Sequence, residues 1–178
     1  MDNRQVCGGE LITPRLRLTP LSKDNRSLIF ALRSDPRVIM HTGISQYMKV
    51  DEADAYIQRI EQEKQDDTCF VWVINLYSTM DQVGTICFWN YSADKKSAEI
   101  GYDLLPAYWG QGYAPEAIKA VLTFGFNRYG FDSVFAYPSE ANAASCRVLE
   151  KAGFQLLEKS ITKNGENDYI SRTYRIIK

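Results

Sequence analysis

The sequence predicts a single α/β (α+β) domain that spans residues 1–178. A chain of 178 residues suits one domain, and it can bury enough surface to fold without a disulfide or a structural metal. Runs of β-branched and aromatic residues, typical of strands, are interspersed with stretches of helical periodicity. No internal repeat or low-complexity tract interrupts that order, so we expect no second domain.

The first third of the chain is expected to form one strand and two helices, with a loop and a short helix over residues 37–50. Residues 11–19 end in apolar/polar alternation, which is typical of a half-buried strand. Asp24 or Asn25 can cap a helix, and the helix must end before Pro36 because the residue preceding a proline is pushed out of the helical region. A second, polar helix is expected to begin at Asp51.

The middle of the chain predicts three strands in series. Residues 69–76 and 83–89 are rich in β-branched and aromatic side chains, and the polar segment 78–82 between them favours a hairpin. A third strand is expected over 98–104 and is stopped by Pro106. Together they predict an antiparallel meander.

The last third alternates between helices and strands. Gly130 suits the left-handed residue that ends a helix, and Gly153 closes a later one. The expected elements are a helix that follows the segment 109–116 and runs to about residue 129, a strand at 133–137, a helix at 142–151 and closing strands at 154–157 and 169–177.

Charge and composition exclude several classes of partner. Lys and Arg number 21 against 22 Asp and Glu, for a net charge of −1, which argues against binding nucleic acid or a membrane surface. No apolar run approaches the roughly 20 residues of a membrane span, and no signal-peptide pattern opens the chain, so a cytoplasmic protein is expected. A small anion held by backbone amides stays compatible with this charge.

Cysteine and histidine offer no metal site or nucleophile. Cys7, Cys69, Cys87 and Cys146 are scattered without the close pairing that zinc ligands show, and reduced thiols are the expected state. His41 is the single histidine and has no Ser or Cys partner beside it. We therefore expect His41 to be structural or to lie at the rim of a cleft, and no metal to be bound.

A glycine-rich turn before a helix is the most informative segment. Gly110 and Gly112 can adopt positive φ, and Pro115 suits the first position of a helix. Such a turn points N–H groups and the positive end of the helix dipole at an anion, which favours a phosphate. The Walker and dinucleotide patterns are absent. The alternative is a tight turn that only redirects the chain.

The wider pattern resembles the GNAT N-acetyltransferase superfamily, most closely its RimJ/RimL-type ribosomal-protein alanine acetyltransferase branch. The resemblance covers nearly the whole chain and is densest over 98–154. It implies a mostly antiparallel central sheet of six to seven strands, flanked by about four helices, with strands splayed at the cofactor site and a bulge in the strand before the loop. The residues that carry it are Thr13 to Leu18, Gly101, Tyr102, Pro106, Tyr108 to Ala114, Glu116, Ala117, Asn142, Ser145, Leu149 to Lys151, Gly153 and Phe154.

The resemblance implies acetyl-CoA as cosubstrate. The family's Q/R-x-x-G-x-G/A loop falls on Trp109 to Ala114, with Trp109 in place of Gln or Arg. The loop N–H groups would hold the pyrophosphate, and the backbone around Tyr102 to Leu105 would bind the pantetheine arm. The cofactor-binding residues implied are Tyr102, Leu104, Trp109, Gly110, Gln111, Gly112, Tyr113, Ala114, Asn142 and Ser145.

Two residues are the catalytic candidates. Ser145 would lie near the sulfur and protonate the thiolate, with Asn142 bonding the pantetheine, although both could simply cap a helix. Many relatives carry a Tyr as general acid where this chain has Leu149. Glu99 is the candidate base for the amine, against a structural strand carboxylate. Tyr137 is a second candidate for the acceptor cleft.

Two further residues are weighed and set aside. Glu116 matches the family but is expected to complement the helix dipole. Cys146 is not expected to carry the acyl group, because no base accompanies it.

The predicted function is transfer of an acetyl group from acetyl-CoA to a primary amine. The acceptor is a protein N-terminal α-amine or a small amine, and transfer is direct, in a ternary complex. The alternative is a non-catalytic module that binds or senses acyl-CoA. A monomer or a homodimer is expected.

Overall fold

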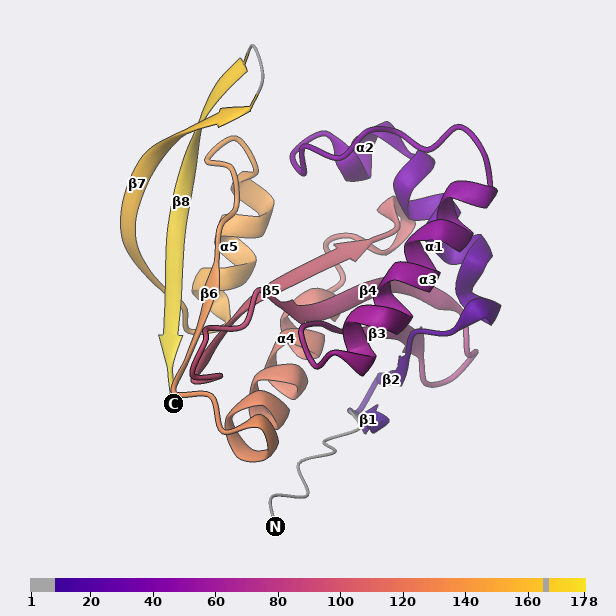
Figure 1. Ribbon diagram of the computed structural model, residues 1–178, viewed down its shortest axis with the longest axis horizontal. Coiled ribbons are helices and arrows are strands. Elements are labelled where there is room, and N and C mark those ends of the chain that lie inside the picture. The colour runs from indigo at the N-terminus through magenta and orange to yellow at the C-terminus, as the bar shows by residue number, and fades with distance from the viewer. Residues whose placement is uncertain (1–8, 165–166) are drawn as a thin grey trace.

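The computed structural model describes residues 9–164 and 167–178, and it contains one eight-stranded sheet in the order β1-β2-β3-β4-β5-β6-β8-β7 (Figure 1). Neighbouring strands are antiparallel except β5 and β6, which are parallel. The strands are β1 Leu11–Ile12, β2 Leu16–Pro20, β3 Phe70–Leu76, β4 Gln82–Trp89, β5 Ser97–Leu104, β6 Ser133–Ala136, β7 Gln155–Asn164 and β8 Asn167–Ile177.

Five α-helices occur in the described part of the chain. They are α1 Arg26–Ser34, α2 Pro36–Ile39, α3 Asp51–Gln65, α4 Tyr113–Phe124 and α5 Ala143–Lys151. Short 3-10 turns lie at Lys23–Asn25 and Pro106–Tyr108, and a π-turn at Gly125–Tyr129 prolongs α4 to left-handed Gly130, as expected for that helix end. None of the described helices is long and apolar enough to cross a membrane.

Among the described residues the sheet has eight strands and the α-helices number five, where six to seven strands and about four helices were expected. A turn at residues 13–15 divides the expected first strand into β1 and β2, which pair with each other at Leu11↔Leu18. The extra helix, α2, is a single turn. Asp35 ends α1 and caps α2, because its carboxylate accepts the N–H of Arg37 at 2.9 Å. The closing strands are also longer than expected.

Helices cover both faces of the sheet. On one face, α4 and α5 pack over a core that includes Trp72, Phe88 and Ile100, and on the other, α1 and α3 pack over a core that includes Val71 and Val73 (Figure 1). Alternate residues of β3 therefore belong to different cores, as the period of a strand requires. The runs of consecutive apolar residues in β3 and β4 follow from burial on both faces.

Strands β5 and β6 diverge, which confirms the splayed strands expected at the cofactor site. They pair only where Ser97–Glu99 of β5 meets Ser133–Phe135 of β6. Residues 100–104 of β5 pair with β4 alone, and Figure 1 shows β5 running away from β6 and β8. The expected bulge in this strand is not found, because its register with β4 is regular from Glu99 to Leu104. The opening results from divergence of two regular strands.

Candidate active site at the open half of β5

The glycine turn follows β5 after the short 3-10 turn at Pro106–Tyr108. Gly110 has φ +73° and Gly112 has φ +81°, which confirms the left-handed backbone expected at both glycines. Gly112 is the cap of α4, which begins at Tyr113, so Pro115 occupies the third position of the helix and not the first. The N–H groups of Tyr113 and Ala114 lie in the first turn, where no carbonyl inside the helix can accept from them.

Three hydrogen bonds fix this loop in place. The indole Nε1 of Trp109 donates to the carbonyl of Leu104 at 2.7 Å, and the side-chain amide of Gln111 donates to the carbonyl of Ala107 at 2.8 Å. Nη1 of Arg15 donates to the carbonyl of Gln111 at 2.9 Å. The loop is therefore tied both to the end of β5 and to the turn between β1 and β2.

Glu116 ties α4 to that same turn. Its carboxylate accepts from Thr13 Oγ1 at 2.6 Å, from the N–H of Arg15 at 3.0 Å and from Nε of Arg15 at 2.7 Å. Partial burial alone would raise the pKa of Glu116, but these donors lower it below its ordinary value. Glu116 lies in the first turn of α4, so it complements the helix dipole as expected, and it also anchors Arg15, which the sequence did not reveal.

Glu99 is the last residue of β5 that is paired on both edges. It is directly opposite Trp89 of β4 on one side and Phe135 of β6 on the other, so the three side chains share one face of the sheet. Burial raises the pKa of Glu99, and a hydrogen bond donated by the side-chain amide of Asn90 opposes that rise. A carboxylate with a raised pKa is a stronger base than an ordinary one, which suits it to accept a proton.

Aromatic side chains surround Glu99. Trp89 is 48% exposed and Tyr137, which directly follows β6, is 47% exposed. The ring of Tyr137 stacks on Phe135 with centroids 6.4 Å apart, and burial together with the charge of Glu99 raises the pKa of Tyr137. Tyr137 therefore lies within electrostatic reach of Glu99. His41 is placed in the turn that follows α2.

Asn142 and Ser145 are found together at the start of α5. Oδ1 of Asn142 accepts the N–H of Ser145 at 3.0 Å, which is the capping arrangement that the sequence allowed as an alternative. The hydroxyl of Ser145 is 2.8 Å from the hydroxyl of Tyr102, a residue of β5. From the sequence, only the backbone of Tyr102 was expected to contact the cofactor. Tyr102 is two residues from buried Ile100 and from buried Leu104, and this spacing indicated that its side chain lies on the same face of the sheet as theirs.

The other face of β5 carries an ion pair that the sequence did not reveal. Nη2 of Arg33, from α1, lies 3.6 Å from Oδ2 of Asp103, and both side chains are largely buried. Burial raises the pKa of Asp103, which the charge of Arg33 only partly offsets. Cys146 is 3% exposed, and its Sγ lies 3.9 Å from the carbonyl of Ser139, so this thiol points into the core.

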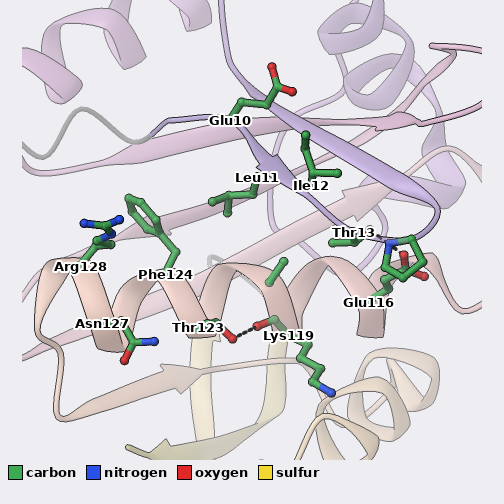
Figure 2. Close-up of a pocket in the computed structure, with 12 residues that line it drawn as sticks. Glu10, Leu11, Ile12, Thr13, Glu116, Lys119, Thr123, Phe124, Asn127 and Arg128 are labelled. Carbon is green, nitrogen blue, oxygen red and sulfur yellow. Dashed lines mark hydrogen bonds between the residues drawn. The ribbon is translucent and has the colours of Figure 1, made fainter.

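A separate groove of about 590 Å³ lies between β1 and α4. Figure 2 shows Thr13 and Glu116 at one end of it and Arg128 at the other, with Leu11 and Phe124 between. Of the candidate residues, it includes only Glu116. No group of His, Cys, Asp and Glu able to hold a metal ion occurs among residues 9–164 and 167–178.

Comparison with known proteins gives a consistent result. Residues 15–155 match the family model described as "Acetyltransferase (GNAT) domain". The chain is 32% identical over 171 residues to the uncharacterized N-acetyltransferase YoaA of Bacillus subtilis, covering 94% of this chain and 96% of that protein.

Two solved structures share the fold. The first is RimL, a ribosomal α-N-protein acetyltransferase, in complex with coenzyme A (TM-score 0.83, 19% identity, 94% of this chain and 97% of that one). The second is spermidine N-acetyltransferase from Vibrio cholerae in complex with CoA and spermine (TM-score 0.81, 17% identity, 93% and 96%).

Proposed function

Because the chain belongs to the GNAT acetyltransferase family and is an acetyl-CoA-dependent N-acetyltransferase, we propose that it transfers the acetyl group directly to a primary amine at the open half of β5. The observation that carries this proposal is the change in pairing at Glu99. Up to that residue β5 is bonded on both edges, and beyond it one edge is open and leads into the glycine loop. The carboxylate and the open edge are thus consecutive in β5, and the turn that would bind an anion comes next in the chain.

The open edge suits the pantetheine arm of acetyl-CoA. The N–H of Leu105 donates to the carbonyl of Val83 in β4 at 2.9 Å. Since successive residues of a strand direct their N–H and C=O to opposite edges, the backbone groups of Leu104 and Tyr102 face away from β4. The carbonyl of Leu104 already accepts from Trp109, so the N–H of Leu104 and both groups of Tyr102 would bond to the arm.

The glycine loop suits the pyrophosphate. N–H groups of Gln111, Gly112, Tyr113 and Ala114 would bind it, at the positive end of the α4 dipole. Glycine at positions 110 and 112 permits the left-handed turns and lets a ligand approach the backbone. These donors add nothing to the net charge of the protein, which is why composition carried no trace of an anion site.

Glu99 and Ser145 would divide the proton transfers between them. Glu99 accepts the proton that the nitrogen of the neutral amine loses as its lone pair attacks the thioester carbonyl, and its raised pKa suits this role. Ser145 protonates the sulfur as the carbon–sulfur bond breaks. The side-chain amide of Asn142 would bond the arm, since its Oδ1 is engaged with Ser145. The burial of Cys146 supports transfer without a covalent enzyme intermediate.

The acceptor would approach from the face that carries Glu99. Trp89 and Tyr137 are half-exposed there and offer flat apolar surface beside the carboxylate. The acceptor is a primary amine, either a protein N-terminal α-amine or a small amine, as the different acceptors named for the two structural neighbours suggest. We expect the protein to act in the cytoplasm as a monomer or homodimer. The free thiols of Cys69, Cys87 and Cys146 are consistent with a reducing compartment.

The test is turnover of acetyl-CoA with a panel of acceptors. Peptides with a free N-terminus, polyamines and aminoglycosides are each incubated with protein and acetyl-CoA, and thiol release is measured together with the mass of the acceptor. We expect acetylation of at least one class. Thermal stabilisation by acetyl-CoA without thiol release across the panel would favour a binding or sensing module instead. No stabilisation at all would defeat both readings of the site.

A further inference from the structure

Tyr102 and Ser145 form a hydroxyl pair at the place where the sheet opens. Tyr102 is in the half of β5 that has left β6, and Ser145 is in the first turn of α5, which follows β6 in the chain. Their hydroxyl oxygens are 2.8 Å apart, and the ring of Tyr102 packs against the core beneath α4 and α5. The pair therefore joins the two diverging parts of the molecule directly below the open strand edge.

Either hydroxyl of this pair can donate to the other. The hydroxyl of Tyr102 is 2.8 Å from Oγ of Ser145, within the usual length of a hydroxyl hydrogen bond, and 3.3 Å from the backbone carbonyl of Ser145. In one of the two arrangements Tyr102 donates its proton to Oγ. Because a serine hydroxyl has one proton and can accept as well as donate, the proton of Ser145 is then free for another acceptor. Burial raises the pKa of Tyr102, which keeps it a donor.

We propose that Tyr102 is a positioning residue that orients the Ser145 hydroxyl to donate its proton to the departing sulfur. The inference rests on the proposed acetyl transfer and adds a residue that acts through Ser145. Many relatives have a tyrosine at the position of Leu149. Here that side chain is a leucine buried in the core, 1% exposed, so α5 has no tyrosine hydroxyl at that position. Tyr102 supplies one from the sheet.

The reaction balances with these groups. The nitrogen lone pair bonds to the acetyl carbon, the carbon–sulfur bond breaks, and its electron pair leaves with sulfur. One proton passes from the nitrogen to Glu99, and one passes from Ser145 to the sulfur, giving the amide and the thiol. Glu99 releases its proton to water and Ser145 recovers one from water. Tyr102 stays protonated throughout, and its hydrogen bond stabilises the Ser145 oxygen while that oxygen carries negative charge.

A double-mutant cycle tests this role. Tyr102→Phe keeps the ring and removes the hydroxyl, and we expect kcat to fall about 10-fold, within the range of acid–base contributions, while the KM for acetyl-CoA changes by less than about 2-fold. Ser145→Ala should lower kcat by at least as much. In the Ser145→Ala background, Tyr102→Phe should have almost no further effect on kcat, because the two residues act as one unit.

Tyr174→Phe is the matched control for stability. The hydroxyl of Tyr174 bonds Glu150 at 2.7 Å, so it also ties a strand to α5 but does not touch Ser145. Both Phe variants should lower Tm, and only Tyr102→Phe should lower kcat. A wild-type kcat in Tyr102→Phe, or additive losses in the double variant, would overturn the inference while leaving acetyl transfer intact. If the wild-type protein acetylates no amine, the proposed function fails first, and this inference with it.

Discussion

The two halves of β5 differ in what holds them. Over Ser97–Glu99 the strand has a partner on each edge, and its position is set by backbone pairing. Over residues 100–104 one edge has no partner strand in the described part of the chain, and side-chain contacts with helices hold the strand in place. Asp103 pairs with Arg33 of α1 on one face of the sheet, and Tyr102 bonds Ser145 of α5 on the other. A strand can thus present a free edge to a ligand without being loose, since consecutive side chains anchor it to helices on opposite faces.

The largest expected effect comes from breaking the anchor to α1. Arg33→Met leaves the largely buried Asp103 without its counter-charge, and we expect unfolding to become easier by about 3 kcal/mol, as for other broken buried pairs. Thermal or urea unfolding measures this. The control is Arg33→Met/Asp103→Leu, which removes both charges and should recover most of the loss. An Arg33→Met protein as stable as wild type would show that the ion pair does not hold the open half.

Removing the carboxylate at the junction should affect catalysis and not folding. Glu99→Gln is expected to lower kcat/KM about 100-fold, typical for loss of a general base. Wild-type activity should rise with pH through the pKa of Glu99, which burial places above the ordinary value, because the base must be ionised. Glu99→Gln should lose this dependence.

The stability of the Glu99 variant has a definite sign. A raised folded-state pKa means that ionised Glu99 costs stability above its unfolded pKa, so Glu99→Gln should have an equal or higher Tm at neutral pH. If the activity of Glu99→Gln had the same pH dependence as that of the wild type, Glu99 would not be the general base.

The next effect concerns the loop after the open half. Gly112→Ala places a Cβ at φ +81° and 3.3 Å from Nη2 of Arg15, and we expect acetyl-CoA to bind about 10-fold more weakly, given a strain of 1–2 kcal/mol in the left-handed region. Calorimetric titration gives the Kd. Gly130→Ala, at φ +76° in open space after the π-turn, has the same strain outside the loop and should leave the Kd unchanged. Equal weakening in both variants would contradict a specific role for the loop.

The smallest expected effect is at the support of the loop. Arg15→Ala removes the bond to the carbonyl of Gln111 and the pair with Glu116, and about a 3-fold rise in the Kd for acetyl-CoA is expected for a half-exposed group of this kind. Arg17→Ala removes a similar exposed pair, with Glu10, away from the loop. If Arg15→Ala and Arg17→Ala bound acetyl-CoA equally well, the loop would need no support from the β1–β2 turn.

The sequence predicted features that depend on local backbone preference. Gly110 and Gly112 are left-handed and the hairpin of β3 and β4 forms as expected, and Asn142 caps α5, which the sequence allowed as an alternative, because each is set within a few residues. The side-chain anchors were missed because they depend on the folded chain. Tyr102 and Ser145 are 43 positions apart, and no spacing rule links them. The prediction of a bulge in β5 was wrong for the same reason. The strand separates from β6 because of how the folded chain packs, and its register with β4 stays regular.

The indole of Trp109 has a consequence for the length of the donor. By bonding the carbonyl of Leu104, it fixes the start of the loop to the end of β5, at a set number of residues from Glu99 and Tyr102. The proposed phosphate contacts and the proposed reacting carbon are then separated by a fixed span of extended strand. The protein would therefore select donors by length. A thioester on a shorter arm could not place its anion in the glycine loop and its acetyl group beside Glu99 at the same time.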